Sequence, residues 1–148
     1  MKIESPSKDV NSSIVKARVL YADTDKMGIV YHANYFRWFE AARGSYMRRR
    51  GRPYTHTEAD GIQLPLIEAG ITYIKPAKYE QILDVRTWLV DIRSVQLTFA
   101  YEITCNGDVL VRGFTRHVAI NPGGFPTRIP DDISLILQSV ENTPDEPF

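Results

Sequence analysis

A long helix is predicted by the stretch Tyr35-Phe-Arg-Trp-Phe-Glu-Ala-Ala-Arg-Gly-Ser-Tyr-Met-Arg48. Its large apolar residues recur three and four positions apart, which places them on one face; they are Tyr35, Trp38, Phe39, Ala42 and Tyr46. Arginines 48–50 complement the negative end of the helix dipole, and Gly51 followed by Arg52-Pro53 predicts the end of the helix. We expect a helix of about 16 residues with an aromatic face that must be buried.

Strands are predicted on both sides of this helix. Between Val95 and Cys105 apolar and polar residues alternate strictly, as expected for a strand with one buried face. Asn106-Gly107 after this run is a strong signal for a tight hairpin. Five stretches have strand character in total: 13–21, 62–74, 81–93, 95–105 and 109–120. The predicted class is therefore α+β with antiparallel strands.

An aromatic helix face needs a broad cover, and the predicted sheet is the only element wide enough. An antiparallel sheet of about five strands wrapped around one long central helix is the hotdog fold, which we predict for residues 13–140. We expect a disordered leader at 1–12 and a flexible tail at 141–148. A single unit leaves sheet edges open, so we expect at least a dimer.

Composition excludes several functions. Eighteen basic residues balance eighteen acidic ones, so we expect no nucleic-acid partner. No apolar run reaches the roughly 18 residues that span a bilayer, and residues 1–10 do not resemble a signal peptide. The single Cys105 excludes an intrachain disulfide and favours a cytoplasmic location. His32, His56 and His117 show no ligand spacing with Cys105, so we predict no metal site.

The loop before the helix, Tyr21-Ala-Asp-Thr-Asp-Lys-Met-Gly-Ile-Val-Tyr-His-Ala-Asn-Tyr35, holds the candidate chemistry. Asp23 and Asp25 lie in a loop that Gly28 allows to turn sharply, and Asn34 is predicted to cap the helix. Backbone N–H groups at a helix start stabilise negative charge. A carboxylate beside them suits attack on an activated carbonyl, as base or nucleophile. The alternative is that both aspartates only bind loop amides.

His32 admits three interpretations: a side-chain acid or base, a backbone N–H that binds an oxyanion, and a packed loop residue. We favour the backbone N–H, because a helix start supplies this donor whatever the side chain. Three basic groups are candidates for binding phosphate, and the pattern does not choose among them. They are Arg48, Arg49, Arg50 and Arg52; Lys75, Lys78 and Arg86; and Arg112, Arg116 and Arg128.

Residues 19–51 resemble the active-site segment of the 4-hydroxybenzoyl-CoA thioesterase family, in its aspartate-type branch. The matching motifs are Tyr21-x-Asp23-Thr-Asp25, Gly28-x-Val30-Tyr31-His32-x-Asn34-Tyr35 and Trp38-Phe39-Glu40-x-Ala42-Arg43. The strand order as far as Pro130 matches more loosely. The resemblance implies a hotdog enzyme that hydrolyses acyl-CoA thioesters without metal or cofactor, as a homodimer or homotetramer.

On this resemblance the family's catalytic aspartate falls on Asp25, and its carbonyl-polarising amide falls on His32. Asp23 is then assigned to capping, and Glu40 and Arg43 are interpreted as structural. Five positions carry over as substrate-binding or loop-organising residues: Gly28, Val30, Tyr31, Asn34 and Tyr35. Three alternatives stay open: an acyl-carrier-protein thioesterase, a hotdog hydratase and a non-catalytic acyl-CoA-binding module. The acyl group is not indicated by the sequence.

Overall fold

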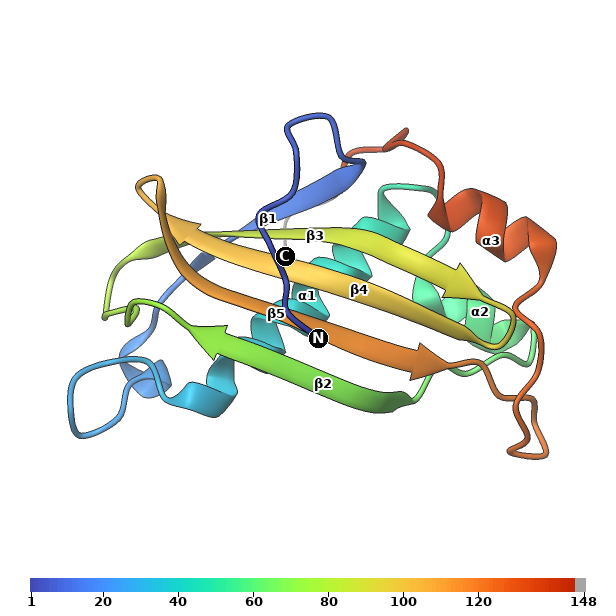
Figure 1. Cartoon of the computed structure of the whole chain (residues 1–148), viewed down its shortest axis with the longest axis horizontal. Helices are drawn as coiled ribbons and strands as arrows, with labels where there is room; N and C mark the ends of the chain where they lie inside the picture. Colours follow the sequence, from blue (N-terminus) through green and yellow to red (C-terminus); the bar gives the residue numbers. More distant parts are fainter. Residues whose placement is uncertain (146–148) are drawn as a thin grey trace.

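Helix α1, Tyr35–Arg48, lies against one face of a five-stranded antiparallel sheet (Figure 1). The computed structural model describes residues 1–145. The sheet order is β1-β3-β4-β5-β2, with β1 at Ser12–Arg18, β2 at Leu66–Tyr73, β3 at Ile82–Arg93, β4 at Gln96–Cys105 and β5 at Asp108–Val118. All neighbouring strands are antiparallel. The predicted α+β class and hotdog arrangement are confirmed.

The aromatic face of α1 forms the centre of the core. Tyr35, Phe39 and Tyr46 are each at most 2% exposed. The ring of Phe39 stacks on Tyr101 of β4, with the centroids 4.3 Å apart and the planes 11° from parallel. Gly113 of β5 permits this approach, because a Cβ there would lie 2.6 Å from the Phe39 ring. Ring packing against β4 and β5 therefore sets the position of the helix over the sheet.

The predicted hairpin at Asn106-Gly107 is confirmed, since both residues have positive φ, 50° and 84°, between β4 and β5. A second hairpin joins β3 to β4. Its turn contains Ser94, which has a φ of 51°, and no glycine in the sequence indicated this turn. The strand predicted from residue 62 begins only at Leu66, directly after Pro65, which has no N–H to donate. Two short helices complete the fold, α2 at Tyr54–Ala59 and α3 at Asp131–Leu137.

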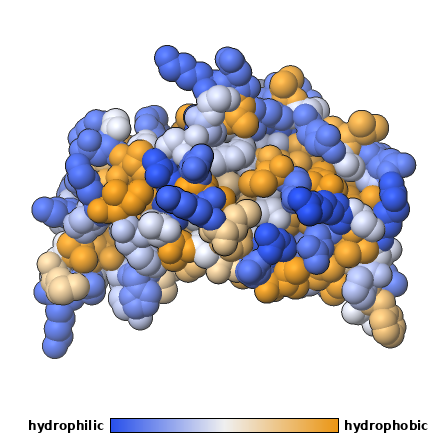
Figure 2. All heavy atoms as spheres, in the orientation of Figure 1, coloured by the Kyte–Doolittle hydropathy of each residue, from blue (hydrophilic) through white to orange (hydrophobic). Residues whose placement is uncertain are grey.

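The N-terminal segment crosses the outer face of the sheet, opposite α1 (Figure 1). There Arg112 donates a hydrogen bond to Ser5 Oγ at 2.7 Å, and Ser5 Oγ binds the carboxylate of Glu102. Figure 2 views this face, on which apolar patches are separated by hydrophilic residues. At the other end of the chain, Arg48 donates two hydrogen bonds to Asp145, at 2.8 and 2.9 Å.

The boundaries of the leader, domain and tail stay predictions. The predicted flexible tail, 141–148, ends in residues 146–148, which lie outside the described residues. Among residues 1–145, no helix has the length and the apolar character that crossing a membrane requires.

Candidate active site

Asp23 holds together the loop that precedes α1. Its side chain is buried, accepts the Leu20 N–H at 2.8 Å and pairs with Arg37 of α1. Its carbonyl oxygen accepts the Tyr31 N–H at 2.9 Å and the Asn34 side-chain amide at 2.8 Å. Four groups from both ends of the loop thus meet at one residue. Asp23 is a loop-organising residue, the role predicted for it.

The prediction that Asn34 caps α1 is wrong. Its backbone is already helical, with φ of −69° and ψ of −21°, and its side chain makes no capping hydrogen bond. Residues His32–Asn34 form a turn of 3-10 helix ahead of α1, so the chain becomes helical earlier than expected. The Asn34 amide binds the carbonyl of Asp23 instead and closes the loop.

Asp25 lies half-buried in the wall of a cavity of about 330 Å³. Its Oδ1 accepts the Met27 N–H at 2.8 Å, and its backbone pairs with Ile29 and Gly28, at 2.8 and 3.0 Å. Gly28 has a φ of +78°, the left-handed turn predicted for it. Among the described residues no group donates to Asp25 Oδ2. This oxygen therefore has no hydrogen-bond partner within residues 1–145.

The start of the 3-10 turn contributes backbone donors to the same region. The N–H groups of His32 and Ala33 donate to no other protein group within residues 1–145. Both belong to the first turn of a helical segment that continues into α1, where negative charge is stabilised. Asp25 and His32, the first residue of this turn, both line the cavity.

The structure adds Tyr73, which the sequence analysis did not identify. This residue ends β2 and donates a hydrogen bond from its hydroxyl to the His32 carbonyl at 2.7 Å. Its ring packs edge-on against Tyr35, with the centroids 5.5 Å apart. Because it lies 41 residues from His32, no local pattern signalled the contact. By holding the His32 carbonyl, Tyr73 orients the peptide that carries the Ala33 N–H.

The other predicted site residues divide into two sets. Val30 and Tyr35 line the cavity together with Asp25 and His32. Three predicted residues do not line it: Gly28, Tyr31 and Asn34. The Tyr31 side chain is exposed, and its ring lies beside that of His32 with the centroids 4.3 Å apart.

Two of the three basic groups are already occupied. In the first, the partners are Asp145 for Arg48, Glu141 for Arg49, Asp60 for Arg52, and Ser13 and Ser139 for Arg50. In the third, Arg112 pairs with Glu102, Arg116 with Glu68 and Arg128 with Asp131. Lys75, from the second group, lines the Asp25 cavity and forms an exposed ion pair with Asp108 at 3.4 Å.

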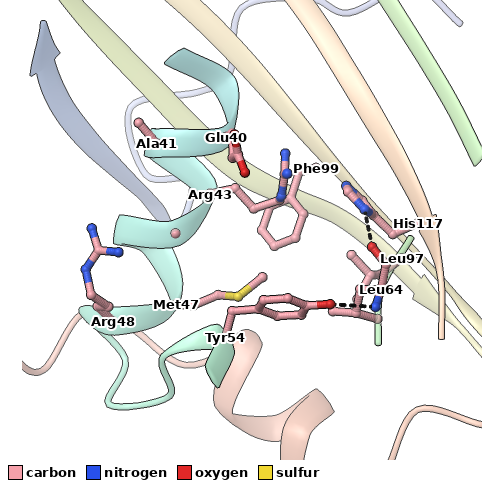
Figure 3. Close-up of a pocket in the computed structure, with 11 residues that line it drawn as sticks. Glu40, Ala41, Arg43, Met47, Arg48, Tyr54, Leu64, Leu97, Phe99 and His117 are labelled. Carbon is pink, nitrogen blue, oxygen red and sulfur yellow. Dashed lines mark hydrogen bonds between the residues drawn. The ribbon is translucent and has the colours of Figure 1, made fainter. Parts of the chain in front are cut away.

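A second cavity, of about 350 Å³, lies between the C-terminal half of α1, α2 and the strands β4 and β5 (Figure 3). Most of its wall is apolar. Its polar groups include Arg43 and His117, which are linked through the sheet. Arg43 donates to Tyr101 Oη at 2.9 Å, Tyr101 bonds to Thr115, and Thr115 bonds to His117 Nε2 at 2.9 Å. His117 Nδ1 bonds to the Leu64 carbonyl at 3.0 Å.

The stability of the fold is expected to fall between pH 6.5 and pH 4 because of His117. Burial, assisted by the charge of Arg43, lowers the pKa of His117 from 6.5 to about 4. Below pH 6.5 the unfolded chain binds this proton and the folded chain does not, so stability that is complete above pH 6.5 is lost as the pH approaches 4. The loss is on the order of 3 kcal/mol. Urea unfolding measured between pH 6.5 and pH 4 tests this expectation. In His117→Gln the free energy of unfolding is expected to fall less steeply as the pH decreases, and an equally steep fall in both proteins would contradict the assignment.

A family model described as the thioesterase-like superfamily matches residues 19–137 of the chain. The chain belongs to this family. A putative acyl-CoA thioesterase of Bacillus subtilis, YneP, is 33% identical to this thioesterase-like protein over 108 residues, which are 72% of this chain and 78% of YneP. The predicted enzyme class, a thioesterase, is confirmed.

Solved structures agree with this membership. The DHNA-CoA thioesterase from Staphylococcus aureus is 34% identical to this thioesterase-like chain and superposes on it with a TM-score of 0.76. The match covers 79% of this chain and 80% of the Staphylococcus aureus chain. A mutant 4-hydroxybenzoyl-CoA thioesterase complexed with 4-hydroxybenzoyl-CoA covers 88% of this chain with 100% of its own, at 22% identity and a TM-score of 0.80. At that identity the likeness concerns the fold.

Proposed function

We propose that this thioesterase hydrolyses acyl-CoA to free acid and CoA, with Asp25 as base or nucleophile and the His32 N–H as oxyanion donor. One observation carries the proposal: the Asp25 carboxylate and the helix-start residue His32 line the same cavity. The similarity to named acyl-CoA thioesterases supports the choice of substrate.

The reaction begins at the thioester carbonyl carbon. Attack by Asp25 itself forms a mixed anhydride that water later opens, whereas Asp25 as a base delivers water directly. Either route places negative charge on the carbonyl oxygen, which the N–H groups of His32 and Ala33 and the dipole of α1 stabilise. The C–S bond then breaks, the thiolate of CoA leaves, and the acid is released. The two routes give the same products.

The remaining predicted residues take supporting roles in this proposal. Val30 and Tyr35 form walls beside the acyl group, and Gly28 shapes the loop; Tyr31 and Asn34 contact the substrate less directly. Lys75 lines the cavity and Lys78 lies just beyond it, paired through its backbone with Ile29. Because they lie at the Asp25 cavity, these two lysines are the proposed contacts for the CoA phosphates.

Thiol release from benzoyl-, short-chain and long-chain acyl-CoAs tests the function and identifies the acyl group. Parallel assays with acyl-carrier-protein thioesters distinguish the two carriers. An enoyl-CoA substrate separates a hydratase, because loss of the double-bond absorbance without thiol release would indicate hydration. Absence of thiol release from every substrate would contradict the proposal.

Tyr73→Phe is expected to lower kcat about tenfold while changing KM little. The hydrogen bond lost is worth roughly 0.5–1.5 kcal/mol, and its removal loosens the peptide that carries the Ala33 N–H, while the ring of Tyr73 still lines the cavity. Steady-state thiol release measures this split. Tyr79→Phe is the matched control, since Tyr79 is similarly exposed and lies against Tyr21. Equal effects of the two substitutions would show that Tyr73 has no positioning role.

We also propose that the chain assembles as a cytoplasmic homodimer or homotetramer through β2. This strand is an edge of the sheet, and Leu66, Ile67 and Tyr73 on it are 46–53% exposed. An open edge with exposed apolar side chains is protected by pairing with another strand. Light scattering is expected to give at least twice the chain mass, and a monomer at micromolar concentration would contradict this.

A further inference from the structure

We propose that the second cavity binds an amphipathic carboxylate, whose charged group pairs with Arg43 and whose apolar body fills the cavity (Figure 3). We call this site the Arg43 pocket; its walls include Arg43, Met47, Leu64, Leu97, Phe99 and His117. It shares no lining residue with the Asp25 cavity. Along α1, the nearest lining residues of the two cavities, Tyr35 and Glu40, are separated by about 7.5 Å.

Arg43 lacks a counter-charge. Its guanidinium donates one hydrogen bond, to Tyr101 Oη, and among residues 1–145 no carboxylate oxygen lies within 4 Å of it. Glu40, one turn earlier on the rim of the pocket, forms no ion pair with it. A half-buried arginine carries five donors and is normally paired with an acid. The arrangement is therefore suited to receive an anion from outside the chain.

The neighbours of Arg43 hold it in place without neutralising it. The Leu64 carbonyl can only accept, so His117 Nδ1 carries the hydrogen and Nε2 accepts from the Thr115 hydroxyl. Thr115 consequently accepts from Tyr101, which accepts from Arg43. Burial lowers the pKa of His117 to about 4 and raises the pKa of Tyr101, so both are uncharged at neutral pH. The guanidinium is oriented by a neutral chain of hydrogen bonds.

The apolar walls of the pocket limit the size of the apolar part of the ligand. Met47, Leu97 and Phe99 are each at most 4% exposed, and the ring of Tyr54 closes another side (Figure 3). A volume of about 350 Å³ is near the lower end of ligand sites, so one ring or a short chain is the expected body. A carboxylate matches the fork of a guanidinium. The choice of a carboxylate among anions rests on the proposed function, because thioester hydrolysis releases an acid with an apolar body.

Benzoate titrated into the full-length, ¹⁵N-labelled protein tests the pocket. Benzamide is the neutral control of the same shape, and acetate is the anion without a ring. We expect benzoate to bind with a Kd on the order of 1 mM and to shift the amide signal of Gly44, which lines the pocket. Benzamide and acetate are expected to bind at least about tenfold more weakly. Absence of benzoate binding, equal binding of benzamide, or shifts confined to His32, which lines the Asp25 cavity, would each overturn the proposal.

Arg43→Gln tests the charged contact. Benzoate binding is expected to weaken by roughly 10- to 100-fold, the effect of losing a charge-assisted pair of hydrogen bonds. Arg49→Gln is the matched control, because it removes the same charge at the C-terminal end of the same helix from a residue that lines neither cavity. It is expected to change binding by less than about twofold. Equal losses in the two variants would overturn the proposal.

Glu40→Gln keeps the test decisive if Arg43→Gln does not fold. Removing a negative charge from the rim is expected to strengthen benzoate binding by about two- to threefold, and unchanged or weaker binding would overturn the proposal.

Asp25→Asn separates this site from the proposed reaction. That variant is expected to lose thiol release and retain benzoate binding. Thiol release that survives Asp25→Asn would reject the catalytic assignment alone, since benzoate binding is measured without turnover.

Discussion

Asp25→Asn is expected to lower kcat for acyl-CoA hydrolysis by roughly 10²- to 10⁴-fold, the contribution of a positioned base or nucleophile. The amide has nearly the shape of the carboxylate, and its oxygen can still accept the Met27 N–H that holds Asp25 Oδ1. Folding is therefore expected to be preserved. Substrate binding should change far less than turnover, because the cavity walls and the helix-start amides are unaltered. Thiol release under saturating substrate measures the loss.

Asp132→Asn is the matched control for this substitution. Asp132 is exposed in the first turn of α3 and lines neither cavity, so the control removes one carboxylate without touching the site. It is expected to retain full activity. Activity of Asp25→Asn within about tenfold of the wild type would remove Asp25 from the chemistry. Absence of thiol release from the wild type and the variant alike would instead favour the non-catalytic binding module.

Phe39→Ala is expected to reduce the free energy of unfolding by about 3–5 kcal/mol, the range for deleting a fully buried aromatic side chain. Phe39 is 0% exposed and stacks on Tyr101 while its edge lies against Gly113. Because β4 and β5 are held apart from α1 by this ring, no neighbouring side chain can fill the space without moving the helix. Urea unfolding monitored by circular dichroism gives the value.

Phe36→Ala provides the comparison for Phe39→Ala. Phe36 lies three positions earlier on α1, is only half-buried and contacts Phe39 edge-on, with the ring centroids 5.6 Å apart. Truncating Phe36 is expected to reduce the free energy of unfolding by about 1–2 kcal/mol, because Phe36 buries less apolar surface on folding than Phe39 does. Equal costs at the two positions would contradict the assignment of Phe39 to the centre of the core.

The candidate site was predictable as far as it is local in sequence. The Asp25 loop, the turn at Gly28 and the helix-start residue His32 are contiguous, so their arrangement follows from turn and helix geometry. The role of Asn34 was mispredicted because its side chain can act in two ways. A capping bond would use Oδ1 as the acceptor of a backbone N–H, whereas the folded loop uses the side-chain N–H as a donor to the carbonyl of Asp23.

The sequence by itself determined the long aromatic helix, the alternating strands, the Asn106-Gly107 hairpin and the loop of aspartates before the helix. Each of these depends on residues a few positions apart, whose spacing sets which face is buried and which backbone angles are allowed. Only the tertiary structure decided that Tyr73 holds the His32 carbonyl and that Arg43 reaches Tyr101, 41 and 58 residues away. Such contacts depend on strand register and on where α1 lies over the sheet, and both result from packing the whole core at once.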